Sequence, residues 1–163
     1  MKHVKHLMLS LVFVAGLPVL SPPGAVQALQ LSFVGLSGGY VVSPQGKANA
    51  GDPDGRGTAA FSVEEGRQGA IKICYIIRVD DIGTPTAVQL RFAGYGQNGP
   101  ILLKLKPPKS GTNGSSSECI AFVGGVRSAL VNRLFRLFFN PLGFYINVQT
   151  AEFPAGALRG QIN

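Results

Sequence analysis

Apolar and polar residues alternate along several short segments of the chain. The clearest is AIKICYIIRVD at 70–80, where every second side chain is apolar and would lie on one face of a strand. TAVQLRF at 86–92 repeats the pattern and puts Gln89 and Arg91 on the opposite face. With Gly, Pro and Asn as strand ends, further strands are predicted at 29–36, 38–44, 58–65, 99–106 and 119–126, and in a final hairpin over 144–162. The segments 46–57 and 107–118 are predicted loops.

One segment departs from this alternation. In SALVNRLFRLFF, residues 128–139, apolar residues recur at helical spacing, Ser128 can cap the start and Pro141 follows the end. We predict a short helix that crosses between strands and packs on the core. The alternative is a helix on a membrane surface, because basic and aromatic residues alternate here. Many short strands with one crossover helix predict an all-β fold, an immunoglobulin-like antiparallel β-sandwich.

Residues 1–28 have the features of a secretory signal peptide. Lys2 and Lys5 precede an apolar run from Leu7 to Leu20, and VQA at 26–28 offers small residues where a signal peptidase cleaves. The run is shorter than the ~20 residues of a bilayer span, which argues against an uncleaved anchor. We therefore expect cleavage after Ala28 and a single mature domain, residues 29–163, that is secreted or held in the periplasm or cell envelope.

Export changes the charge and the available chemistry. The full chain has 15 Lys and Arg against 8 Asp and Glu, and loss of the two leader lysines leaves 13 against 8, a net charge of +5. Both histidines lie in the leader, so the mature chain has none. This excludes Ser-His-Asp and Cys-His catalysis and imidazole metal ligands. The positive charge, including Lys104, Lys106 and Lys109, suits an anionic envelope polymer. Nucleic acid is excluded as a partner, because export separates the chain from it and no recognition module is present.

The two cysteines, Cys74 and Cys119, form an even pair in a chain predicted to reach an oxidising compartment. This favours one structural disulfide. The alternative is a redox or metal-binding pair, but the chain has no CxxC motif.

The C-terminal stretch NPLGFYINVQTAEFPAGALRGQI, residues 140–162, resembles the signature of the CHRD domain, the chordin-type domain of many exported microbial proteins. Segments 33–44, 51–63, 73–82 and 86–100 also resemble the family and follow in its order, and both cysteines match positions that many microbial members share. The resemblance implies a β-sandwich of the superoxide-dismutase-like kind.

Typical family members carry histidine at the position of Gln149 and His-x-His where this chain has Gln89-Leu90-Arg91. Residues i and i+2 share a strand face, so such histidines could converge on one ion. Arginine repels cations and a glutamine amide is a weak ligand for transition metals. The resemblance therefore implies a metal site from which this chain departs at all three positions, and we expect no metal and no other cofactor.

Gln89, Arg91, Gln149 and Arg159 form the candidate polar contact patch, which could hold a carboxylate, a sulfate or a sugar hydroxyl. The alternative, which we favour, is a solvated strand face. Glu152 and Arg159 flank the last turn and could pair across the hairpin.

These observations predict an exported, non-enzymatic binding or structural module. Its partner would be an unidentified protein or an anionic envelope polymer. The alternatives are a metal-binding, superoxide-dismutase-like protein and a module that associates with membrane surfaces through residues 128–139.

Overall fold

The structure is a computed structural model that describes residues 27–65, 71–122 and 141–162. Eight strands form one curled antiparallel sheet in the order β5-β4-β7-β8-β1-β2-β3-β6. The strands are β1 (Gln27–Ser37), β2 (Arg56–Glu65), β3 (Ile71–Asp80), β4 (Pro85–Phe92), β5 (Ile101–Leu105), β6 (Gly114–Phe122), β7 (Phe144–Thr150) and β8 (Leu158–Gln161).

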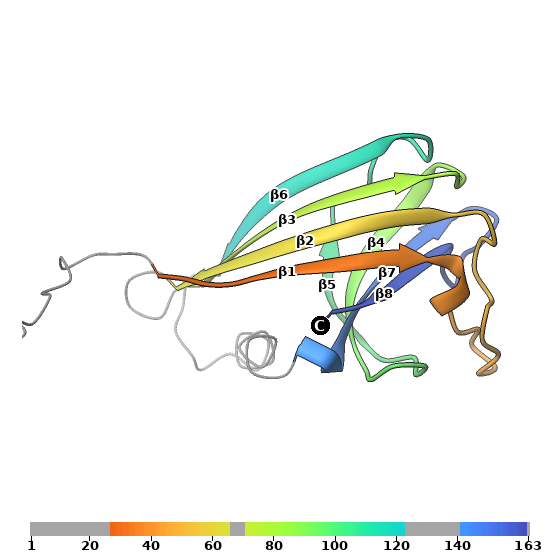
Figure 1. Ribbon diagram of the computed structural model, residues 1–163, viewed down its shortest axis with the longest axis horizontal. Coiled ribbons are helices and arrows are strands. Elements are labelled where there is room, and N and C mark those ends of the chain that lie inside the picture. The colour runs from red at the N-terminus through yellow and green to blue at the C-terminus, as the bar shows by residue number, and fades with distance from the viewer. Residues whose placement is uncertain (1–26, 66–70, 123–140, 163) are drawn as a thin grey trace, which may run out of the picture.

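The sheet folds over into two layers. β8 and β1 share a single register pair, Ser37 with Arg159, so the sheet bends sharply between these strands. Figure 1 shows β1, β2, β3 and β6 side by side as one layer, with β4, β5, β7 and β8 behind it. This arrangement confirms the predicted all-β antiparallel sandwich.

The core lies between the two layers. The alternation predicted for β3 is present, because all five apolar residues at its odd positions are buried and the intervening ones are partly buried or exposed. Apolar side chains from the other strands, including Phe61, Leu90, Ile146 and Leu158, meet them in one cluster. Burial of this apolar surface is the main favourable term in folding.

The open side of the sandwich, between β5 and β6, is closed by polar contacts. The hydroxyl of Tyr75 on β3 accepts a hydrogen bond from the backbone N of Lys106 at 2.7 Å. Ser116 Oγ on β6 donates to the carbonyl O of Lys106, also at 2.7 Å. The edge of one layer is thereby tied to the edge of the other.

Two of the predicted segments are corrected. The strand predicted at 38–44 is instead a 3-10 helix, η1 (Gly38–Tyr40), followed by an irregular segment in which Val41 and Val42 are buried. A Cβ at Gly38 would lie 1.8 Å from the carbonyl O of Asp52, so this segment is packed directly against the next loop.

The second correction concerns β6, which begins at Gly114, inside the predicted loop 107–118. Its polar start reflects its place at the sheet edge, where Ser115 and Ser117 are exposed. A second short 3-10 helix, η4 (Pro141–Gly143), precedes β7.

The predicted signal peptide lies mostly outside the described residues, and the predicted helix at 128–139 lies wholly outside them. Among the residues that the structure describes, none forms a helix long and apolar enough to cross a bilayer.

Candidate functional site

The four residues of the contact patch lie on β4, β7 and β8, on the face that points away from the core. In the register of these strands, Gln89 stands opposite Asn147, and Asn147 stands opposite Arg159. Arg91 stands opposite Tyr145 one row along. Their neighbours in sequence, among them Leu90 and Val148, are the core residues. Alternation therefore places the patch on one surface, as the sequence suggested.

The two glutamines bind each other. Gln89 Nε2 donates to Gln149 Oε1 at 3.2 Å, and Gln149 Nε2 donates to the carbonyl O of Pro154 at 2.7 Å. Asn147 Nδ2 in the neighbouring position donates to the carbonyl O of Ala155 at 3.0 Å. The turn between β7 and β8 is thus fastened over the strand face by side-chain amides.

Arg159 is the most deeply buried charged residue of the patch, with 2% of its surface exposed. Its guanidinium carbon lies 3.6 Å from the centroid of the Tyr145 ring. Arg159 Nη2 donates to the carbonyl oxygens of Gly94 at 3.2 Å and Gln97 at 2.8 Å. Burial lowers the pKa of the Arg159 guanidinium, and the nearby charge of Arg91 lowers it further. The guanidinium therefore holds the 93–100 loop against the sheet.

Arg91 is less well satisfied than Arg159. Its Nη1 lies 3.5 Å from the hydroxyl of Tyr145, which also accepts a hydrogen bond from the backbone N of Gly99 at 3.1 Å. Within the described part of the chain, Arg91 Nε and Gln89 Oε1 are buried without a hydrogen-bond partner. A buried polar atom of this kind costs about 1–3 kcal/mol.

Two expectations about this face need correction. It is not a solvated strand face, because Gln89 and Arg159 are buried beneath loops and only Arg91 and Gln149 keep appreciable surface. Arg159 does not pair with Glu152, which is exposed, and directs its guanidinium to backbone carbonyls instead. A strand pattern shows which way a side chain points but not what covers it.

Three further residues belong to this cluster that were not predicted from the sequence: Tyr145, Asn147 and Asn98. Tyr145 and Asn147 precede Gln149 at intervals of two, so β7 presents three polar groups on one face. That alternation was available as a signal. Asn98 offers no such signal, because it reaches the site from a loop. Its Oδ1 lies 3.5 Å from Arg159 Nη1, and its Nδ2 donates to the carbonyl oxygens of Val42 and Ser43 at 3.0 and 2.9 Å.

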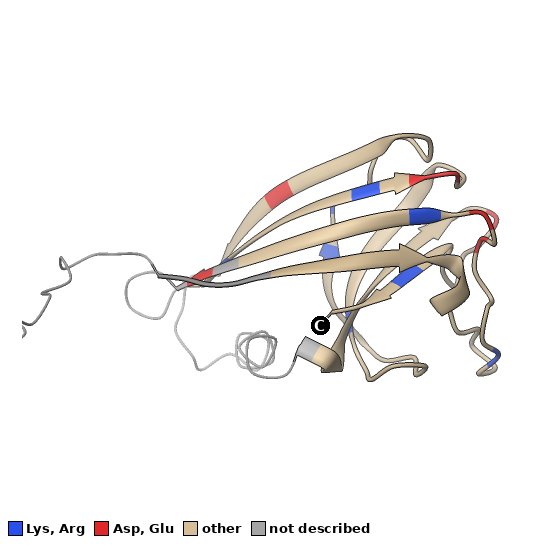
Figure 2. Ribbon diagram, in the orientation of Figure 1, with Lys and Arg blue, Asp and Glu red and all other residues tan. Residues whose placement is uncertain are grey.

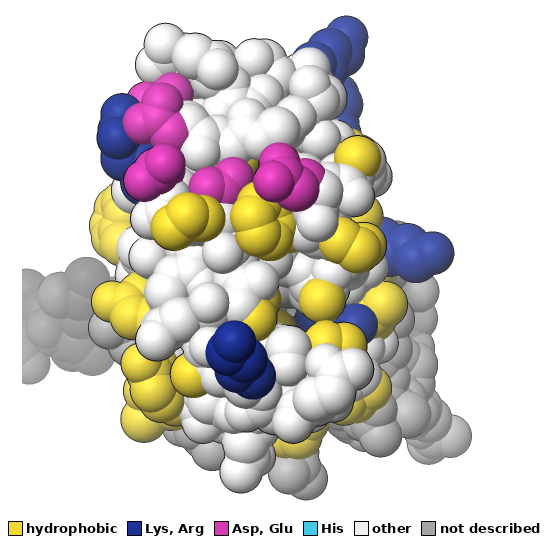
Figure 3. Space-filling model, turned by 90° about the vertical axis from the view of Figure 1, so that its right-hand side faces the viewer, with side chains coloured by type: hydrophobic (Ala, Val, Ile, Leu, Met, Phe, Trp, Pro, Cys, Tyr) yellow, Lys and Arg dark blue, Asp and Glu magenta, His cyan; other side chains and the backbone are white. Residues whose placement is uncertain are grey.

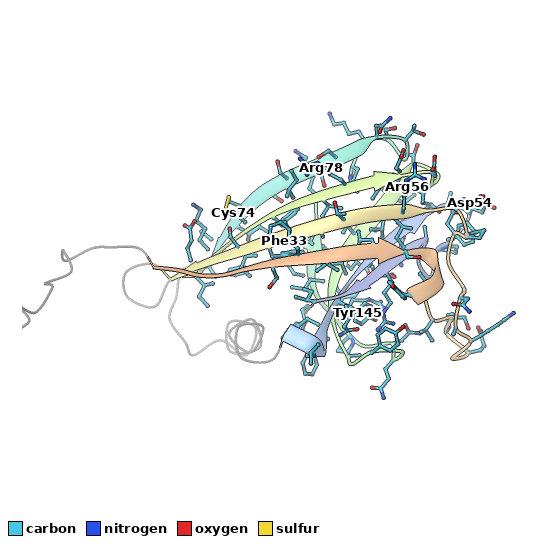
Figure 4. All side chains as sticks on the ribbon, in the orientation of Figure 1. Phe33, Asp54, Arg56, Cys74, Arg78 and Tyr145 are labelled. Atoms are coloured by element: carbon cyan, nitrogen blue, oxygen red, sulfur yellow. A yellow bond between two sulfur atoms is a disulfide. The ribbon has the colours of Figure 1, made fainter. Side chains whose placement is uncertain are left out.

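The predicted disulfide between Cys74 and Cys119 is present, on the other layer. The two residues face each other across β3 and β6, with Cα atoms 4.0 Å apart. Both side chains point away from the core, and Figure 4 shows Cys74 and Tyr145 in different layers.

The residues at the positions that resemble a metal site do not fit a transition metal ion. Gln149 Oε1 already accepts a hydrogen bond from Gln89, and the third position holds the guanidinium of Arg91. In the described ranges, no group of three or more His, Cys, Asp or Glu side chains is placed to hold a metal. The arrangement offers amide oxygens, which are weak ligands for transition metals, beside guanidinium groups that repel a cation.

Charged groups are unevenly placed over the two layers (Figure 2). Arg56 at the start of β2 forms ion pairs with Asp80 at 2.7 Å and with Asp81 at 2.5 Å. Near the opposite end of β3, Lys72 forms an ion pair with Glu64 at 3.3 Å. These pairs are exposed and contribute little to stability.

The family model of the CHRD domain matches residues 33–162. No curated protein and no solved structure matches the chain.

Proposed function

Because the chain belongs to the CHRD domain family, we propose that it is an exported module that binds a partner or builds structure and has no enzymatic activity. It would act at the cell envelope or outside the cell, after removal of residues 1–28. Its partner would be a protein or an anionic polymer of the envelope.

The observation that carries this proposal is the hydrogen bonding of Gln89, Arg91 and Gln149. A catalytic metal needs free electron-pair donors and an open coordination position. Here Gln149 Oε1 accepts a hydrogen bond from Gln89, and the amide oxygen of Gln89 is only a weak ligand for transition metals. The two guanidinium groups on the same face add positive charge. What the cluster does instead is fasten the 93–100 loop and the β7–β8 turn to the sheet.

Metal analysis of the purified, exported protein tests the proposal. We expect copper and zinc far below one ion per chain after incubation with either metal, and no dismutation of superoxide. A stoichiometric, tightly held ion or measurable turnover would refute the proposal and favour the superoxide-dismutase-like alternative.

A variant with histidine at all three positions is the matched control. Gln89→His, Arg91→His and Gln149→His together place imidazoles at i and i+2 of β4 and on the adjacent β7, and remove one positive charge. We expect this variant to take up zinc. Its uptake would show that the parent chain fails to bind because of its side chains and not because its backbone has the wrong shape.

N-terminal sequencing of the exported product tests the location. We expect the mature chain to begin at Leu29. Retention of the intact precursor in the membrane fraction would contradict the export step while leaving the metal analysis unaffected.

A further inference from the structure

Three polar side chains form a row across the outer face of β2, β3 and β6. The strand register places Thr58 opposite Arg78 and Arg78 opposite Ser115, and all three are exposed. They line a hollow of about 440 Å³ together with Arg56, Asp80 and Asn113. Figure 4 labels Arg56 and Arg78 near the ends of the neighbouring strands β2 and β3.

A second hollow of about 380 Å³ adjoins the first. Lys106, Lys109 and Ser110 line it, with serines of β6. Asn113, Gly114 and Ser115 belong to both hollows, so the two form one continuous track over the edge strand β6. Hydroxyl groups follow the track from Thr58 on one side to the serines of β6 and Ser110 on the other.

The corner between the hollows is held in place by backbone contacts. Asn113 has a positive φ of 48°, and its backbone N donates to Asp80 Oδ1 at 3.0 Å. This hydrogen bond and the nearby guanidinium of Arg56 lower the pKa of the Asp80 carboxyl, whose negative charge keeps Arg56 engaged. A ligand would therefore meet a preformed surface.

The charge along the track is positive. Four basic side chains line the two hollows, Arg56, Arg78, Lys106 and Lys109, and Asp80 is the one carboxylate among the lining residues described. Arg56 is already paired with acids, whereas none of the ion pairs formed among the described residues involves Arg78, Lys106 or Lys109. Figure 3 shows basic groups on both sides of an uncharged area at this end of the molecule, above a row of acidic groups.

We infer that this track binds a linear anionic polysaccharide that carries carboxylate groups. Separated cations suit repeated negative charges along a chain, and the hydroxyls between them suit the hydroxyls of sugar rings. Among the lining residues that the structure describes, none is aromatic, so they offer neither the aromatic anchors typical of protein interfaces nor a surface for stacking bases. The inference rests on the proposed function, since it names the partner of a module at the envelope.

Binding to polygalacturonate, with neutral dextran as the comparison, tests the inference. The test variant is Arg78→Gln with Lys109→Gln, which removes one exposed cation from each hollow. The control is Lys47→Gln with Lys72→Gln, which removes the same charge from exposed sites that line neither hollow. Thermal unfolding checks that all four sites tolerate the change.

We expect the exported parent protein to bind polygalacturonate and not dextran, and to release it at high salt. The test variant should bind roughly 25-fold more weakly, at about fivefold for each cation removed, while the control stays within about twofold of the parent. If both variants lost the same amount of affinity for polygalacturonate, net charge alone would attract the polymer. The track would then not be its binding site.

Other results would also overturn the inference. If the protein bound dextran as well as polygalacturonate, the negative charge of the polymer would not be what the track recognises. If it bound inorganic polyphosphate tightly and polygalacturonate not at all, the track would not recognise a polysaccharide. Absence of any binding would refute this partner and leave the proposed function standing, because the metal analysis decides that separately.

Discussion

Tyr75 links the two layers at the open side of the sandwich, and its replacement by phenylalanine gives a direct test of that closure. The residue is buried, with 4% of its surface exposed. Its hydroxyl accepts from the backbone N of Lys106 at 2.7 Å and donates to Glu118 Oε2 at 2.9 Å. Phenylalanine keeps the ring and removes both hydrogen bonds.

The expected loss can be worked out from these two contacts. The N–H of Lys106 would be left without this acceptor, which costs about 1–3 kcal/mol for a buried donor and lies towards the lower end here, because the hydrogen bond is only partly buried. The bond to Glu118 adds less, about 0–1 kcal/mol, because this carboxylate is exposed and water replaces the hydroxyl. Tyr75→Phe should therefore lower the free energy of unfolding by about 1–4 kcal/mol at neutral pH.

The pH dependence gives a sharper signature. Burial raises the pKa of Tyr75 to about 12; the hydrogen bond from Lys106 opposes this rise, and Glu118 adds to it. Since the folded state holds this proton more tightly than the unfolded state, the stabilisation is complete below pH ~10 and is lost as the pH rises through ~12. The rise from 10.0 to about 12 corresponds to about 3 kcal/mol.

Urea unfolding of the parent and of Tyr75→Phe over the range from pH ~7 to ~11.5 measures both effects. The difference between the two proteins should shrink above pH ~10, since other groups titrate alike in both. Tyr95→Phe is the control for loss of a tyrosine hydroxyl, because Tyr95 is 73% exposed and its replacement should leave the free energy of unfolding close to that of the parent. A difference that stays constant over the whole range, or a variant as stable as the parent, would refute the account.

Three further changes test other parts of the fold by urea unfolding. Replacing Cys74 and Cys119 by serine opens a loop with a sequence separation of 45 and should lower the free energy of unfolding by about 4 kcal/mol on the chain-entropy model. A loss below about 1 kcal/mol would show that strand pairing already supplies the constraint. Arg159→Met should cost about 2–4 kcal/mol and raise hydrogen exchange in the 93–100 loop, and unchanged exchange there would contradict its fastening role. Gly156→Ala should cost about 1–3 kcal/mol, because φ is 151° and a Cβ would lie 2.4 Å from Asn147 Oδ1; parental stability would disprove that close approach.

The strands that the sequence predicted best are those with one face on the core. Alternating apolar positions in 70–80 identify β3, because a repeat of two residues indicates both that the segment is a strand and which of its faces is buried. The sequence predicts β6 from residue 119, whereas the strand begins at Gly114, because its first half lies at the sheet edge and is rich in serine. The apolar pair Val41 and Val42 predicts a strand, but two adjacent apolar residues can also be buried by an irregular segment that packs on a loop.

The candidate site could be predicted only in part, for a related reason. Alternation within each strand predicts that Gln89, Arg91 and Gln149 lie on one outer face. This prediction needs only the pairing of two neighbouring strands. The cover over that face depends on contacts between residues far apart in sequence, such as Arg159 with Gly94, which are 65 positions apart. No local pattern in 93–100 indicates that these carbonyls will point at a guanidinium.

The outer face of β4, β7 and β8 is covered by loops, whereas the outer face of the other layer is exposed to solvent. This difference limits where a partner can bind. On β4, β7 and β8 the polar groups are used to hold loops down, so a ligand there would have to displace existing hydrogen bonds. On the other layer, Phe33 is 67% exposed, and nothing lies within 4 Å of the space above Gly35. Breaking the hydrogen bonds of a buried polar cluster to admit a ligand costs free energy. Binding to a surface that is already exposed and ordered does not carry that cost. A partner of this protein should therefore meet the layer of β1, β2, β3 and β6, where the disulfide holds the edge strand of the track in place.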